Sequence, residues 1–147
     1  MARIIALDVG SKRIGFAVSD ELAVIATPRG LVHRQSYNKD AAAIGELVEQ
    51  EQAERVLVGL PTGLSGRPTE QTRRAERFAE MLASRLSVPV ELWDERLTTV
   101  MARRIRPSAT RTPAREAESV DAVAAALILQ SYLDRRSPLS PSDSSSA

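Results

Sequence analysis

The sequence predicts an α/β fold in which helices pack on the faces of a mixed β-sheet. Two short apolar runs, at residues 4–7 and 14–18, flank a turn that contains Gly10, and this pattern is typical of a β-hairpin. Farther along, segments with apolar residues at helical spacing alternate with short apolar runs of strand length. A hairpin followed by such alternating units implies that antiparallel and parallel strands share one sheet.

The first half of the chain predicts three strands and one helix. After the hairpin we expect a third strand at residues 23–27, stopped by Pro28, because proline donates no hydrogen bond to a sheet. Apolar residues at helical spacing then predict a helix over residues 41–54, with Ser36 or Asn38 as its N-cap.

The next segments predict a strand, a helix and a last strand. Residues 55–60 form a short apolar run that predicts a buried strand, closed by Pro61. Pro68 suits the first turn of a helix, which we expect to run on through Leu82. Residues 88–93 predict the final strand of the sheet.

The C-terminal part predicts helix rather than strand. We expect a short basic helix at residues 98–104, a loop at 106–113 and a final helix at 114–133. With no internal repeat, residues 1–135 are expected to form a single domain. Residues 136–147 are rich in Ser and Pro and carry too little apolar surface to fold, so we expect a disordered tail.

Composition excludes several classes of protein. No cysteine occurs among the 147 residues, which excludes disulfide frameworks and thiolate metal sites. The one histidine excludes His-rich zinc sites and argues against His-based catalytic triads. No apolar run reaches the roughly 18 residues that span a bilayer. The N-terminus does not resemble a signal peptide, so we expect a cytoplasmic protein without a membrane partner. Chemistry here has to depend mainly on carboxylates, hydroxyls and cations.

Charge is distributed unevenly, although the net charge is only +1. Residues 96–115 contain no acidic residue. The arginines in that range are Arg96, Arg103, Arg104, Arg106, Arg111 and Arg115. Because guanidinium groups bind phosphate through two parallel hydrogen bonds, this arginine patch fits a nucleic-acid partner. Charge alone fits a solvated surface equally well.

Acidic residues stand at the edges of three apolar elements: Asp8, the pair Asp94–Glu95, and Asp121. Taken singly, each has a plainer interpretation as a turn residue, a helix cap or a solvated helix position. Taken together they could converge in a folded sheet and offer the hard oxygen ligands that Mg²⁺ or Mn²⁺ prefers. Paired divalent ions activate water and stabilise the leaving oxygen of a phosphodiester, so this set predicts a nuclease.

Four motifs resemble the YqgF/RuvX family of RNase-H-like nucleases. They occupy residues 7–20, which begin Leu-Asp-Val-Gly, 58–61, 94–99 and 121–129. The motifs occur in the family's order across about residues 3–133, which is nearly the whole chain.

The resemblance implies an RNase H-like fold, with a five-stranded mixed sheet whose first three strands are antiparallel and with helices on both faces. It implies metal-dependent cleavage of structured nucleic acid, processing the 5′ end of precursor 16S rRNA or, alternatively, resolving Holliday junctions. Carried over by motif, Asp8, Glu95 and Asp121 are the catalytic, metal-binding acids for Mg²⁺ or Mn²⁺, with two ions expected when substrate is bound. The role of Asp94 stays open.

Cations near these acids are the candidates for contacting the nucleic acid. They are Lys12, Arg13, Arg96, Arg103, Arg104, Arg106, Arg111 and Arg115. If a four-way junction is the substrate, a homodimer is expected, because symmetric cuts need two active sites.

Two other classes of function remain open. A nucleic-acid-binding factor without catalysis would use the same cations, although clustered carboxylates would repel its phosphate ligand. The Asp8-Val9-Gly10 segment with Gly15 also resembles the phosphate loop of actin-like ATPases and sugar kinases. Those ATP-dependent phosphotransferases close two such domains over the nucleotide, and this chain is expected to hold one.

Overall fold

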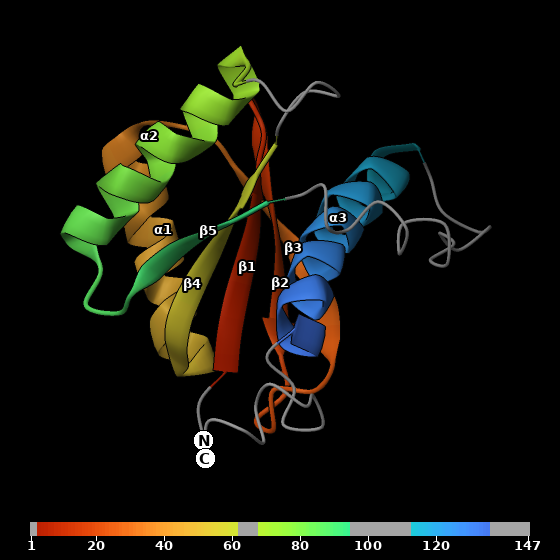
Figure 1. The fold of residues 1–147 in the computed structure, drawn as a ribbon. Helices are drawn as coiled ribbons and strands as arrows, with labels where there is room; N and C mark the ends of the chain where they lie inside the picture. The colour runs from red at the N-terminus through yellow and green to blue at the C-terminus, as the bar shows by residue number, and fades with distance from the viewer. Residues whose placement is uncertain (1–2, 62–67, 95–112, 136–147) are drawn as a thin grey trace.

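Residues 3–61, 68–94 and 113–135 are described by the computed structural model, and the side chains of the last segment are described from Val120 onward. These residues form three layers. Helices α1 (Tyr37–Glu51) and α2 (Glu70–Arg85) cover one face of a five-stranded sheet, and helix α3 (Pro113–Arg135) covers the other (Figure 1). The α/β fold with helices on both faces is therefore confirmed.

The strands run in the order β3-β2-β1-β4-β5 across the sheet. Their bounds are Arg3–Val9 for β1, Arg13–Ser19 for β2, Ala26–His33 for β3, Ala53–Leu60 for β4 and Val90–Asp94 for β5. The β1–β2 and β2–β3 pairs are antiparallel, and the β1–β4 and β4–β5 pairs are parallel. The mixed sheet and its antiparallel first three strands were both predicted. Because β1, β4 and β5 are parallel, their carboxyl ends meet at one edge.

The third strand differs from the prediction. It was expected at residues 23–27, with Pro28 as its end, but β3 begins at Ala26 and continues through Pro28 to His33. Two features explain why proline is tolerated there. β3 is an edge strand, and the β2–β3 register shifts between Phe16 and Ala17, beside the pairing of Ala17 with Pro28. At an edge or a bulge, the missing N–H costs little.

The residues before β3 form a tight turn. The carboxylate of Asp20 accepts hydrogen bonds from the backbone N–H groups of Val24 and Ile25, both at 2.8 Å. Ala23 adopts a left-handed conformation with φ of 57°. Gln130 of α3 fastens this turn, since its side chain accepts from Ala26 N and donates to Val24 O, each at 2.9 Å.

Two helix starts deviate from expectation because their caps lie outside the apolar stripe. Ser36, one of the two predicted caps, accepts from Lys39 N at 3.2 Å, so α1 begins at Tyr37 rather than near residue 41. Helix α2 starts at Glu70 after the cap Thr69, so Pro68 precedes the helix instead of lying in its first turn. Among the described helices, none is long and apolar enough to cross a membrane.

The core has a separate cluster on each face of the sheet. Side chains alternate along a strand, so Ile5, Leu7 and Val9 of β1 face α1 and α2, whereas Ile4 and Ala6 face α3. On the first face α1 and α2 contribute large side chains such as Ile44, Phe78 and Leu82. On the second face α3 contributes Ile128, Leu129 and Leu133 toward its C-terminal end and the small Ala125 and Ala126 one turn after Asp121.

Two predicted elements lie outside the described residues: the helix at 98–104 and the tail at 136–147. The predicted loop at 106–113 also lies outside them except for Pro113, which begins α3 rather than ending a loop.

Candidate active site

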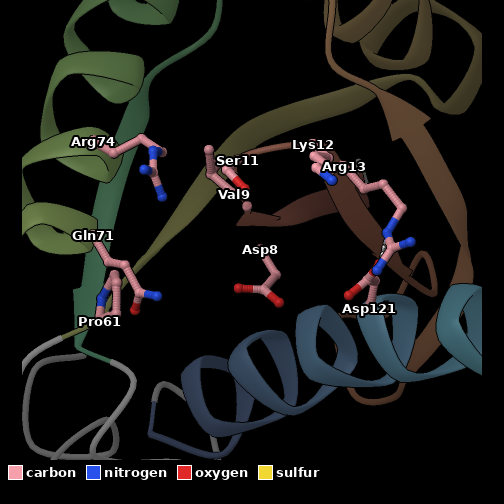
Figure 2. Close-up of a pocket in the computed structure, with 10 residues that line it drawn as sticks. Asp8, Val9, Ser11, Lys12, Arg13, Pro61, Gln71, Arg74 and Asp121 are labelled. Atoms are coloured by element: carbon pink, nitrogen blue, oxygen red, sulfur yellow. Dashed lines mark hydrogen bonds and ion pairs between the residues drawn. The ribbon is translucent and has the colours of Figure 1, made fainter.

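A cleft of about 410 Å³ opens at the carboxyl ends of β1 and β4. Its lining residues come from both faces of the sheet. They are Asp8, Val9, Gly10, Ser11, Lys12, Arg13, Pro61, Gln71, Arg74 and Asp121 (Figure 2). In open α/β sheets, ligands bind outside the carboxyl ends of the strands, so this cleft is the natural candidate for a functional site.

Asp8 lies between the two sides of the cleft (Figure 2). It is the second-to-last residue of β1, half-buried, and it pairs across the antiparallel ladder with Gly15 of β2. Because side chains alternate along β1, Asp8 faces the same side as Ala6, which is the side covered by α3.

Asp121 is brought to the same region by the close approach of α3 to β2. A Cβ atom added at Gly15 would lie 2.1 Å from the backbone oxygen of Asp121. Only a residue without a side chain permits that approach. Since Gly15 is also the ladder partner of Asp8, one glycine lets acids from the first strand and the last helix line one cleft. Two of the three acids predicted from sequence are thereby brought together.

Arg13 forms an ion pair with Asp121. Its Nε donates to Asp121 Oδ2 at 2.7 Å, and the two side chains are 43% and 24% exposed. Figure 2 shows the arginine reaching from β2 to the acid on α3. The pair offsets the charge of the cation that the sequence assigned to phosphate binding. Lys12, in the adjoining turn, is exposed and lines the cleft.

Of the remaining acids and cations considered in the sequence, only Asp94 has a described side chain. Asp94 ends β5 opposite Leu60, at the edge of the sheet where β4 also ends. Glu95, Arg96, Arg103, Arg104, Arg106 and Arg111 lie outside the described residues, and the side chain of Arg115 is not described. Within the described part of the chain, no group of three His, Cys, Asp or Glu side chains could hold a metal ion.

Sequence analysis missed a buried ion pair that supports the β1–β2 turn. Asp40 is 1% exposed, and its carboxylate accepts from Arg34 Nε at 3.2 Å and from Gln35 N at 3.0 Å. Arg34 in turn donates from Nη1 to Gly10 O at 2.9 Å and from its backbone N to Lys12 O at 2.8 Å. These hydrogen bonds from Arg34 fix the backbone of the turn that carries Lys12.

Arg34 is further fixed by aromatic packing. Its guanidinium carbon lies 5.1 Å from the ring centre of Phe78 and 5.8 Å from that of Tyr37. An acid in the first turn of a helix is ordinary in a sequence, so nothing in the pattern around Asp40 marked it as buried.

The other side of the cleft is formed by Gln71 and Arg74 of α2, which sequence analysis also missed. The first turn of α2 is tied to the end of β4, because the hydroxyl of the buried Thr72 donates to the carbonyl of Pro61. Residues three apart share one face of a helix, so this anchor directs both Gln71 and Arg74 toward the cleft.

Comparisons with known proteins agree with the resemblance. The family model described as "RuvX: Holliday junction resolvase" matches residues 2–135. The chain is 40% identical over 134 residues to a protein of Koribacter versatilis (strain Ellin345), covering 91% of this chain and 88% of that one. It is 44% identical over 133 residues to a protein of Chloroflexus aurantiacus (strain ATCC 29366 / DSM 635 / J-10-fl), covering 90% and 87%. Both are named "Putative pre-16S rRNA nuclease".

Two solved structures share the fold. T. thermophilus RuvC in complex with a Holliday junction substrate aligns with a TM-score of 0.58 at 18% identity, covering 92% of this chain and 96% of that one. Fowlpox virus resolvase with Holliday junction DNA aligns with a TM-score of 0.53 at 10% identity, covering 90% and 97%. These likenesses show an RNase H-like fold.

Proposed function

The chain belongs to the RuvX family of nucleases, and from that premise we propose that it is a divalent-metal-dependent hydrolase that processes the 5′ end of precursor 16S rRNA. The observation that carries the proposal is the meeting of Asp8 and Asp121 across Gly15 in a cleft that cations also line. The names of its curated relatives support the choice of substrate.

The donor set in the cleft fits Mg²⁺ or Mn²⁺. Asp8 and Asp121 offer carboxylate oxygens, which are the hard ligands that these ions prefer. We propose Glu95 as the third ligand, because it follows Asp94 directly at the end of β5. When bound, such ions, two with substrate present, would activate a water molecule and stabilise the leaving oxygen.

The chain's own cations would hold the substrate. Lys12 and Arg13 border the acids and suit the phosphates beside the scissile bond. Asp121 orients Arg13 through the 2.7 Å ion pair. The arginine patch of residues 96–115 would extend the contact to more distant phosphates, and it includes Arg103, Arg104 and Arg106. Residues 1–135 would act as one catalytic domain in the cytoplasm, where precursor rRNA is processed.

A second candidate is cleavage of four-way DNA junctions. It is favoured by the description of the matching family and by the shared fold with T. thermophilus RuvC. This substrate would require a homodimer, because symmetric cuts need two active sites.

The test offers a labelled 5′ leader of precursor 16S rRNA and a synthetic four-way junction, each with Mg²⁺ or Mn²⁺. We expect the wild-type protein to cut the leader, and Asp8→Asn and Asp121→Asn to cut at least about 100-fold more slowly while still binding it. Asp134→Asn is the matched control, because Asp134 lies near the far end of α3 and accepts from Gln130. It is expected to cut normally.

Each contrary outcome has its own meaning. Unchanged cleavage by Asp8→Asn overturns the assignment of the active site. Cleavage of the junction alone selects the second candidate. Binding of both nucleic acids without cleavage identifies a non-catalytic binding factor, and hydrolysis of ATP would identify a phosphotransferase.

A further inference from the structure

The α2 side of the cleft carries a cation that no motif assigns. Arg74 is half-buried, lines the cleft and lies one helical turn after Gln71. Figure 2 shows both side chains extending from α2 into the cleft, on the side of Asp8 opposite Asp121 and Arg13. Helix α2 is firmly packed on the sheet, because its own residues Ala75, Phe78 and Leu82 are fully buried.

Arg74 differs from its neighbours on the helix in its charge environment. Arg77 pairs with Glu70 at 3.3 Å, and Arg73 lies in a separate depression that Glu76 and Glu80 also line. Within the described part of the chain, Arg74 makes no ion pair and no hydrogen bond. Its guanidinium group therefore keeps its full charge and donors for an external anion.

The charges of the cleft explain why such a cation is needed. Asp8 and Asp121 repel phosphate, and Arg13 is already paired with Asp121. Among the described lining residues, the cations without an ion pair are Lys12 on the β1–β2 turn and Arg74 on α2. They lie on different sides of Asp8 (Figure 2), so a strand crossing the acids would meet a positive charge on each side.

We propose that Arg74 binds a backbone phosphate of the nucleic-acid strand as it leaves the acids on the α2 side, with Gln71 beside it as a polar contact. The inference rests on the proposed function and names a further binding residue for it. Because guanidinium contacts phosphate through a planar pair of donors, Arg74 would fix the register of the strand over Asp8 as well as its affinity.

The test measures binding in the Asp8→Asn background, where the labelled leader and junction are not cut. Fluorescence anisotropy gives Kd over a series of salt concentrations for Arg74→Ala, Arg74→Lys and the control Arg73→Ala. The control removes the same charge from the adjacent residue of α2, outside the cleft. Thermal unfolding checks that every variant is folded.

Arg74→Ala is expected to raise Kd about tenfold and to lower the slope of log Kd against log salt by about 0.7–0.9, the loss of one phosphate contact. Arg73→Ala should change Kd less than about twofold and leave the slope unchanged. Arg74→Lys should restore the slope but only part of the affinity, because its charge remains while the paired donors are lost. In the cleaving protein, Arg74→Ala should raise KM more than it lowers kcat.

Equal losses in Arg73→Ala and Arg74→Ala, or no loss in either, would overturn the assignment of Arg74 while the Asp8→Asn protein still binds. If the wild-type protein neither binds nor cuts either nucleic acid, the proposed function itself fails. The two failures are thus separate observations.

Discussion

On the α3 face of the sheet the cleft depends on backbone packing, whereas on the α1 and α2 face it depends on charged side chains. The α3 helix lies so close to β2 that Gly15 has no space for a Cβ atom. On the opposite face, Arg34 reaches from the buried Asp40 to the carbonyl of Gly10.

The two faces are therefore sensitive to different kinds of substitution. Packing of a helix against a strand backbone has no tolerance for an added atom, because interiors are close-packed. A buried ion pair instead leaves an uncompensated charge when one partner is removed.

The largest effect should come from Gly15→Ala. A Cβ atom 2.1 Å from the backbone oxygen of Asp121 forces α3 away from β2, and we expect a loss of more than about 3 kcal/mol in the free energy of unfolding. Cleavage should be lost with it, because Asp121 moves away from Asp8. Urea denaturation and the cleavage assay measure the two effects.

Gly30→Ala is the control for this substitution. A Cβ atom there would lie 3.5 Å from the ring of Phe16, an ordinary van der Waals contact, so the change should cost less than about 1 kcal/mol. If both alanine variants are equally stable, the close approach of α3 is not what holds this face.

Removing the buried acid should have the next largest effect. Asp40→Ala leaves Arg34 partly buried without its partner, and we expect a loss of about 3 kcal/mol by urea denaturation. Glu91→Ala breaks the more exposed pair between Arg55 and Glu91 and should cost less than about 1 kcal/mol. A small loss in Asp40→Ala would contradict the role given to side chains on this face.

Removal of Arg13 tests whether its ion pair with Asp121 opposes metal binding at the cleft. Because Arg13 occupies an oxygen of Asp121, Arg13→Ala should tighten the binding of Mn²⁺ alone about fivefold, measured by calorimetry without substrate. Lys12→Ala removes the same charge without touching Asp121 and should tighten it less. Equal effects would mean that Arg13 acts on the metal only through its positive charge and not through its contact with Asp121.

The smallest effect concerns the turn before β3, at the other end of the α3 face. Hydrogen bonds from the backbone N–H groups of Ile25 and Val24 hold the pKa of Asp20 below its usual value of 3.8. The stabilisation is present above that value and is lost as pH falls through the lower pKa of the folded protein. At pH 7 Asp20→Ala should therefore lower Tm by a few degrees, and the difference should shrink as the pH falls below 3.8.

Glu21→Ala serves as the control for Asp20, since Glu21 lies next to it and is exposed, with only a 3.9 Å contact to Arg3. Its effect should be smaller and should not reproduce that pH dependence. A difference between Asp20→Ala and wild type that does not shrink in acid would mean that the side chain acts otherwise than as a charged acceptor.

The sequence was informative where a residue's role depends on its neighbours along the chain. Apolar periodicity and turn residues predicted most strands and helices, and the family motifs singled out Asp8 and Asp121, which line one cleft in the fold. The strand at Pro28 was misassigned because the tolerance of proline depends on β3 being at the edge. Arg34 and Asp40 were missed because their burial depends on contacts with distant residues such as Phe78 and Gly10. Arg74 was missed because its place in the cleft depends on how α2 packs beside β1.

The contact between Gly15 and Asp121 also has a consequence for synthesis of the protein. Translation proceeds from β1 to α3, so Asp8 leaves the ribosome long before Asp121 does. Contacts between such distant segments form late. A nascent or truncated chain therefore contains the first of the two proposed catalytic acids without the last, so the proposed active site stays incomplete until α3 has been made and has docked.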